Sequence, residues 1–187
     1  MAAMCDPDKC TGCGLCASMC RSQAITMVCK RHGHLYPQIY KEKCTNCGLC
    51  KQICSANSNI RKVIPQHAFA AWSKDYKEYT TSTSGGASAE LAKFFIARGG
   101  VVYGCTIKEG VKAEHIRVEN AKDLPLIKGS KYVQSNMVNA IPLIREDVRR
   151  GKVFRSIPMM RVENEKKQKE LYDTLPEIIT KKWFDVV

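Results

Sequence analysis

The chain has 187 residues, 44% hydrophobic and 26% charged, which is typical of one ordinary domain or of a small module followed by a modest domain. No apolar run approaches the roughly 20 residues of a membrane span, and the first ten residues lack the basic and apolar regions of a secretory signal. We therefore expect a cytoplasmic protein, in which eleven cysteines indicate metal or redox chemistry rather than disulfide bonds.

Two segments of the N-terminal third carry the same cysteine pattern. CTGCGLCASMC begins at Cys10, and CTNCGLCKQIC begins at Cys44. The spacing C-x2-C-x2-C-x3-C is typical of ferredoxins with two [4Fe–4S] clusters, where three close cysteines hold one cluster and the fourth binds the other. The sequence therefore predicts two [4Fe–4S] clusters. The first would be bound by Cys10, Cys13, Cys16 and Cys54, and the second by Cys44, Cys47, Cys50 and Cys20.

Zinc is the alternative metal for these thiols. It is commonly held by two separated C-x2-C pairs, whereas here the third and fourth cysteines follow at once in both segments. Gly12, Gly14 and Gly48 also fit a backbone that passes close to a cluster. The proline that usually follows the fourth cysteine is replaced by Arg21 and Ser55, which bears on the cluster potentials and not on the ligands.

The stretch between the two motifs predicts a pair of strands. Residues 24–28 and 35–39 are short β-like runs on either side of a probable turn at 30–34. Together with the motifs they predict the duplicated strand, loop and helix of a dicluster ferredoxin. We expect the other cysteines and histidines of this region not to be ligands: Cys5 and Cys29 should be packed or partly exposed thiols, and His32 and His34 solvated rings.

The formal net charge is +12. A cubane with four thiolates carries about −2, so two bound clusters would lower the charge to roughly +8. Lys and Arg are mixed with acids, as in RVENEKKQKE, which favours a solvated surface. The alternative is docking of an acidic redox partner protein or subunit. No basic run is interleaved with aromatic residues, so we expect no nucleic-acid partner.

Composition changes after Cys54, and we place a domain boundary near residue 62. The following residues alternate between helical and strand-like patterns. The expected elements are a helix at 87–98 with Leu91, Phe94 and Phe95 inward, strands at 101–107 and 113–120, a short helix or turn at 121–129, an extended piece at 131–135, and a helix at 139–151 with Ile141, Ile144 and Val148 on one face. Cys105 is expected to pack in the core.

The fold class follows from these elements. We expect an α+β dicluster ferredoxin-like domain over residues 1–61, followed by a partial α/β domain over residues 62–152. Residues 153–187 form an atypical polar tail that we expect to be helical.

The segment TSTSGG, just before the helix at 87–98, has two interpretations. One is a capped loop, because Ser, Thr and Gly favour such positions. The other is an anion site, because the start of a helix suits a phosphate group. Neither a G-x-G-x-x-G nor a Walker motif is present.

The dicluster motif, STSGG at 82–86 and KGSKYVQS at 128–135 together resemble the coenzyme F420 hydrogenase/dehydrogenase beta-subunit family, in its bacterial form with an N-terminal ferredoxin domain. The resemblance covers roughly residues 5–152 and implies a flavoprotein oxidoreductase that passes electrons between clusters, FAD and a flavin or deazaflavin-type acceptor. It implies that one set of residues lines the flavin or substrate site: Ser82, Thr83, Ser84, Gly85, Gly86, Lys131 and Tyr132.

The chain departs from this family after residue 152. The family's Gly-x-Pro-Cys-Gln loop is absent, and the chain ends about 150 to 200 residues early, which we interpret as a truncated or frame-shifted product or a fragment. The sequence therefore leaves two functions open. One is an iron–sulfur oxidoreductase subunit with a flavin. The other is a non-catalytic ferredoxin-like carrier whose flavin domain is incomplete.

Overall fold

The computed structural model describes residues 4–30, 33–58, 68–110, 112–152, 154–156 and 179–184. The chain forms two compact units. The first contains Met1–Lys62, Ile107–His115 and Lys131–Glu146, and the second contains Val63–Thr106, Ile116–Ser130 and Asp147–Val187. No helix within the described ranges is long and apolar enough to cross a membrane.

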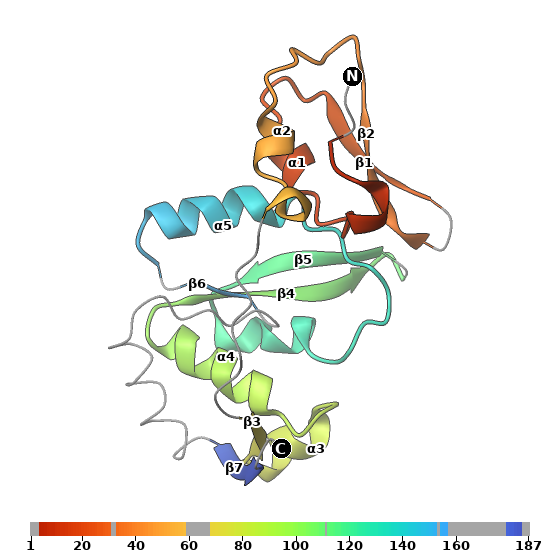
Figure 1. Ribbon diagram of the computed structural model, residues 1–187. Coiled ribbons are helices and arrows are strands. Elements are labelled where there is room, and N and C mark those ends of the chain that lie inside the picture. Colours follow the sequence, from red (N-terminus) through yellow and green to blue (C-terminus); the bar gives the residue numbers. More distant parts are fainter. Residues whose placement is uncertain are drawn as a thin grey trace. The chain divides into compact units, whose positions relative to one another are not determined.

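The first unit is built on a two-stranded antiparallel sheet (Figure 1). Strand β1 (Ile25–Cys29) pairs with β2 (Leu35–Ile39), with Ile25 opposite Ile39. Each cysteine motif ends in one short helix, α1 (Leu15–Ser18) or α2 (Leu49–Gln52), and these two helices pack against each other. The two predicted strands are therefore confirmed. Two 3-10 turns also belong to this unit, η1 (Pro7–Lys9) and η3 (Ser55–Asn57).

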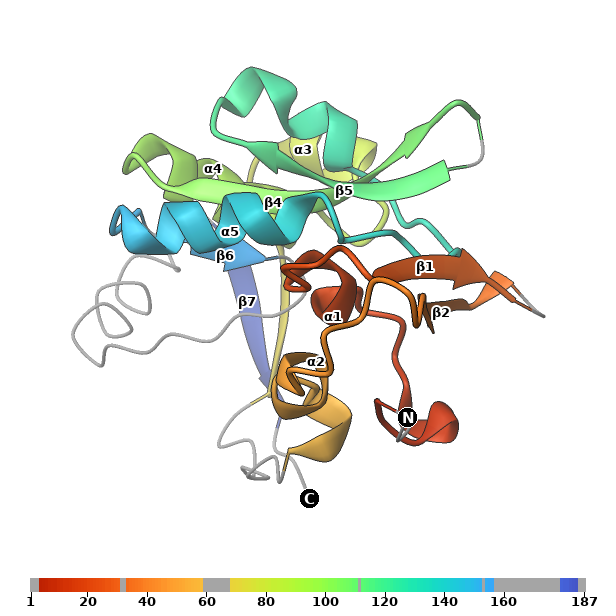
Figure 2. The same cartoon turned by 90° about the horizontal axis from the view of Figure 1, so that it is seen from above.

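The second unit contains two small sheets. Strand β3 (Ala68–Ser73) runs antiparallel to β7 (Ile179–Phe184). The other sheet has the order β5-β4-β6 (Figure 2), and its strands β4 and β6 are parallel. The remaining elements are α3 (Tyr76–Thr81), α4 (Ala87–Ala97), β4 (Val101–Lys108), β5 (Lys112–Val118), the 3-10 helix η4 (Ala121–Ile127), α5 (Ala140–Arg149) and β6 (Phe154–Ser156). Three of them are divided between the units, because residues 107–108 of β4, 112–115 of β5 and 140–146 of α5 belong to the first unit.

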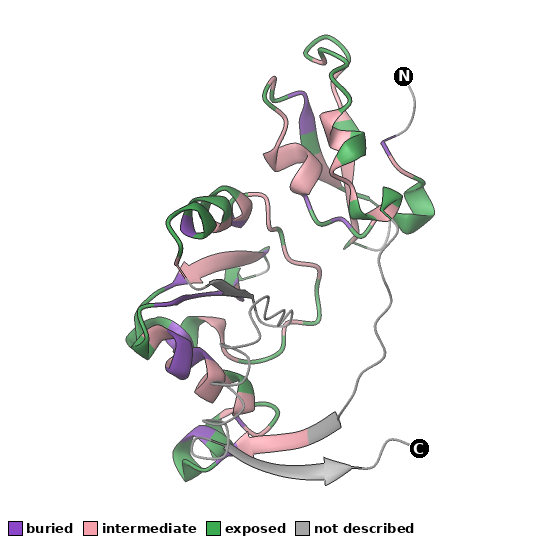
Figure 3. Cartoon of the chain, turned by 60° about the vertical axis from the view of Figure 1, so that its left-hand side comes forward, coloured by how far each residue is buried: buried purple, intermediate pink, exposed green. Residues whose placement is uncertain are grey.

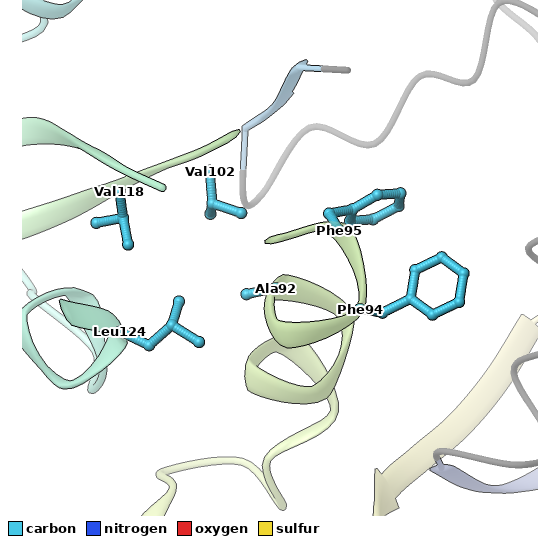
Figure 4. Packing of buried hydrophobic residues seen from close by; sticks show 6 residues of the cluster. All are labelled: Ala92, Phe94, Phe95, Val102, Val118 and Leu124. Atoms are coloured by element: carbon cyan, nitrogen blue, oxygen red, sulfur yellow. The ribbon is translucent and has the colours of Figure 1, made fainter. Parts of the chain in front are cut away.

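The core of the second unit lies between α4, η4 and the sheet (Figure 4). It consists of Ala92, Phe94, Phe95, Val102, Val118 and Leu124. The predicted helix and strand on either side of the Gly-Gly pair are confirmed. The helix ends there because Gly99, at φ 74°, lets the Gly100 amide turn back and donate to the Phe95 carbonyl at 2.9 Å. Figure 3 shows that burial is greatest along β4.

Helix α5 departs from its expected inward face at Val148. Val148 is 57% exposed and Asp147 only 3% exposed, whereas Ile141 and Ile144 are half-buried as expected. Helical periodicity places charged residues in solvent, so it does not predict a buried Asp147. Asp147 is instead buried against two partners, accepting from the hydroxyl of Tyr103 and from the guanidinium of Arg117.

The tail also differs from its expected helix where it is described. Residues 154–156 and 179–184 form the strands β6 and β7. The intervening part of the predicted helix, residues 157–178, lies outside the described residues, as does His32.

Candidate iron–sulfur site

One pocket of the first unit collects the four cysteines assigned to the first cluster. Cys10, Cys13 and Cys16 come from the first motif, and Cys54 is the last cysteine of the second motif. The other walls of the pocket are mainly apolar, with Met4, Leu15, Met27, Pro37 and Ala56. This arrangement suits a cluster held by three close cysteines and one distant cysteine.

The two cysteine loops share one backbone conformation. Gly14 and Gly48 both have φ 76° and immediately precede α1 and α2. Two positions earlier, Gly12 has φ 66° and Asn46 has φ 54°. These left-handed residues turn each loop sharply between consecutive cysteines, as a chain that wraps around a compact group requires. Sequence reasoning identified the three glycines and missed Asn46, although alignment of the two repeats places it opposite Gly12.

The thiols of each loop hinder one another's ionisation. Burial raises the pKa of Cys16 to about 11, and the neighbouring Cys13 and Cys10 add to the shift. Burial, with Cys47 and Cys44, also raises the pKa of Cys50. Because charged thiolates are disfavoured here without a counter-charge, binding of cationic iron would drive their deprotonation and release protons.

Cys20 lies in a different environment. Burial alone would raise its pKa, but hydrogen bonds outweigh burial and lower it. The amide of Ala24 donates to its Sγ at 3.3 Å, and the hydroxyl of Ser22 lies 3.5 Å away. This environment favours the thiolate, the form that binds iron.

The other three cysteines assigned to the second cluster, Cys44, Cys47 and Cys50, follow one another along the second loop. Cys20 follows α1, which packs against α2. Among the described residues, no three His, Cys, Asp or Glu side chains converge on one point as ligands of a single metal ion would. A cube does not require that convergence, because each of its irons takes its own thiolate.

Two residues outside the motifs support the first site and were expected to be structural or solvated. Cys5 lines the same pocket, and burial together with hydrogen bonding to Cys54 and Cys10 raises its pKa to about 12. His34 is half-buried, and its Nε2 donates to the carbonyl of Cys10 at 3.1 Å. The spacing of the motifs contains no signal for either residue.

The loop assigned to a flavin, residues 82–86, lies between α3 and α4. Gly85 and Gly86 are left-handed, at φ 74° and 80°, and no side chain caps α4 at Gly86. Ser82 donates to the carboxylate of Glu78 at 2.7 Å. Both interpretations of the loop therefore remain: no side chain caps the start of the helix, but Gly86 is buried next to Glu78 and the Ser82 hydroxyl already has an internal partner.

Glu78 is the centre of a polar network that sequence reasoning missed. Its carboxylate forms a salt bridge with Lys93 at 2.8 Å and another with Lys128. Burial would raise its pKa, but these two lysines and Ser82 lower it to about 2. An adjacent pocket is lined by Asp75, Lys77, Glu78, Thr81, Lys93, Pro125 and Lys128. None of the five loop residues assigned to the flavin lines it.

Lys131 and Tyr132, the other residues assigned to the flavin, belong to the first unit, whereas the loop belongs to the second. Tyr132 is 93% exposed. The seven assigned residues are therefore divided between the two units, five in the second and two in the first.

Comparison with known proteins agrees with the cysteine geometry. A family model described as a 4Fe-4S dicluster domain matches residues 9–58. A search of curated proteins finds no match for the chain. The matched residues include all eight motif cysteines, from Cys10 to Cys54. The chain thus carries a 4Fe-4S dicluster domain at its N-terminus.

Proposed function

We propose that this protein transfers electrons between a redox partner and an acceptor through two [4Fe–4S] clusters. The observation that carries the proposal is the pocket in which Cys54 of the second motif joins Cys10, Cys13 and Cys16 of the first. When bound, each cluster supplies a one-electron redox couple. The chain supplies thiolate ligands, tight loops and an apolar wall that limits water.

The acceptor that we propose is a flavin or deazaflavin-type group bound by the second unit. Its support is the uncapped start of α4 at Gly86 and the nearby pocket, where Lys77, Lys93 and Lys128 provide positive charge. Such groups suit the phosphates of a dinucleotide such as FAD. On this proposal the chain is an oxidoreductase subunit of the coenzyme F420 hydrogenase/dehydrogenase beta-subunit type.

A non-catalytic electron carrier is the second candidate. It is favoured by Glu78, whose carboxylate already engages Lys93, Lys128 and Ser82 and so neutralises much of the pocket's positive charge. Among the described residues that line the pocket, none has an aromatic side chain against which a flavin ring would stack.

Anaerobic purification separates the candidates. We expect about eight irons and eight sulfides per chain, the content of two cubanes. One released flavin per chain, with absorption near 450 nm that survives removal of the clusters, would support the oxidoreductase subunit. Clusters without flavin would support the carrier. Zinc without iron would refute both.

We place the docking of an acidic redox partner at the second loop. Cys47 is exposed there, and the neighbouring Lys41, Lys43 and Lys51 are exposed as well. Reversal of these three charges should slow oxidation of the reduced protein by a trianionic cobalt complex severalfold at low salt and accelerate oxidation by a tricationic one. Reversal of Lys112 and Lys122, in β5 and η4, should have a much smaller effect. Equal effects of the two sets would place docking elsewhere.

A further inference from the structure

A side chain from far along the sequence holds the first cysteine loop. The amide of Gln134 donates through Nε2 to the carbonyl of Thr11 at 2.9 Å and accepts through Oε1 from the amide of Leu35 at 2.6 Å. These two partners fix which end of the Gln134 amide is oxygen and which is nitrogen, because the Thr11 carbonyl needs a donor and the Leu35 N–H needs an acceptor. One side chain thus bridges the loop and the start of β2.

Gln134 is itself held in place by its neighbours. The hydroxyl of Ser135 lies 2.8 Å from Nδ1 of His115. The backbone of Asn136 forms a parallel bridge beside β5, donating to the carbonyl of Ala113 at 2.8 Å and accepting from the amide of His115 at 3.0 Å. Gln134 therefore lies in a segment that the bridge at Asn136 holds against β5.

Neighbouring side chains pack closely against the two glycines of the first cysteine loop. A methyl group at Gly12 would lie 2.1 Å from Nε2 of Gln134, and one at Gly14 would lie 2.7 Å from Cγ2 of Val138. At Gly48, the counterpart of Gly14 in the second loop, a methyl group would meet nothing within 4 Å. Gly12 and Gly14 are buried, whereas Asn46 and Gly48 are exposed. The first loop is therefore covered at positions where the second loop is open.

We infer that Gln134 is a positioning residue that fixes the first cysteine loop and thereby sets the stability and reduction potential of the first cluster separately from the second. The inference rests on the proposed function. The carbonyls of Cys10 and Thr11 are both bound from outside the loop, by His34 and Gln134. The loop cannot turn these oxygens toward the cluster, and its N–H groups keep their orientation. Hydrogen bonds and solvent access at the sulfurs are the protein's main means of setting a cluster potential.

Two substitutions test this role. Gln134→Glu keeps the acceptor for Leu35, but it replaces the donor to Thr11 by a negative charge. Reduction makes a cluster more negative, so the reduced first cluster should become less stable and its potential should fall. Gln134→Ala removes both hydrogen bonds, so a chelator should extract about half of the irons roughly tenfold faster than from the wild type. Gln38→Ala, at an exposed position of β2, is the control and should change neither property.

The potentials are measured by anaerobic redox titration monitored by electron paramagnetic resonance. The signal that is missing from Cys54→Ser identifies the first cluster. Exchange of the Leu35 amide with solvent, measured by NMR, is a readout that needs no cluster: it should accelerate in Gln134→Ala and stay slow in Gln38→Ala. Equal shifts of both clusters, wild-type potentials in Gln134→Glu, or unchanged exchange at Leu35 would overturn the inference. Protected exchange in a wild-type chain that binds no iron would refute the proposed function and the cluster role together, while leaving the contact itself demonstrated.

Discussion

Asn46 adopts the same left-handed backbone conformation as Gly12, with φ of 54° and 66° respectively, at the equivalent position of the second cysteine motif. Asn is among the non-glycine residues that tolerate this conformation best. The surroundings differ, because a side chain at Gly12 would collide with Gln134 and with the carbonyl of Leu35, whereas Asn46 is exposed. The two motifs have the same backbone conformation, but only the first is packed against other side chains.

This difference predicts that Gly12→Ala disrupts the first cluster. The new methyl group would lie 2.6 Å from the Leu35 carbonyl, and the left-handed backbone itself costs an alanine about 1–2 kcal/mol. We expect about four irons per chain after anaerobic reconstitution instead of about eight. Asn46→Gly is the matched control and should retain both clusters, since glycine adopts this conformation freely. Full iron content in Gly12→Ala would contradict the prediction.

In the assignment of ligands, the fourth cysteine of each motif binds the cluster that is held mainly by the other motif. Cys54→Ser should eliminate the cluster bound mainly by the first motif, and Cys20→Ser should eliminate the one bound mainly by the second. Cys5→Ser should retain both, because Cys5 lines the first pocket in addition to four assigned ligands. The electron paramagnetic resonance signal of the remaining cluster is compared with the signals of Cys13→Ser and Cys47→Ser, and this comparison shows which cluster is lost. The assignment fails if Cys54→Ser behaves like Cys47→Ser.

The lowered pKa of Glu78 predicts that the stability of the second unit depends on pH. Its pKa is about 2 in the folded chain and about 4.5 in the unfolded one, so the unfolded chain binds the proton more tightly. The stabilisation is present above pH 4.5 and is lost as the pH falls toward 2. It amounts to roughly 2–3 kcal/mol, since the carboxylate is largely buried.

Glu78→Gln should therefore destabilise the second unit at pH 7, and the difference from the wild type should shrink as the pH falls below 4.5. Denaturant unfolding followed by tryptophan fluorescence measures this, because Trp72 and Trp183 both belong to the second unit. Glu109→Gln is the control, since its carboxylate is 72% exposed. A difference that does not change with pH would refute the role of the Glu78 charge.

The contact between Tyr103 and Asp147 predicts that two conservative substitutions lower the free energy of unfolding by different amounts. The Tyr103 hydroxyl donates to Asp147 at 2.6 Å, and Arg117 donates to both oxygens of the same carboxylate, at 2.6 and 3.1 Å. Tyr103→Phe should cost about 1–2 kcal/mol, because Asp147 keeps Arg117. Asp147→Asn should cost about 3 kcal/mol or more, because it leaves the guanidinium of Arg117 without its buried counter-charge.

The same fluorescence-detected unfolding measures both variants. Tyr76→Phe is the control at a tyrosine that is 79% exposed, and it should be close to neutral. A larger loss in Tyr103→Phe than in Asp147→Asn would show that the hydroxyl, rather than the ion pair, holds this part of α5.

The sequence by itself determined the dicluster motif, the strands β1 and β2, and the succession of α4, β4 and β5. These depend on local signals: the spacing of cysteines, short β-branched runs and a Gly-Gly pair after a helix. The family model confirms a 4Fe-4S dicluster domain at residues 9–58, and the assignment of each cysteine to one cluster stays a prediction.

Only the tertiary structure decided the surroundings of these elements. Gln134 and Val138 reach the first loop from more than 100 residues away, so no local pattern announces the contact. Asp147 of α5 is buried, against the rule that charged residues face water, because Tyr103 of β4 and Arg117 of β5 bind its carboxylate. The tail was expected to be helical, yet Ile179–Phe184 forms a strand because β3 offers it a backbone edge. The spacing of cysteines along the chain decides which side chains can bind a cluster. Long-range packing decides which side chains are buried or exposed, and which of them are held in a charged form.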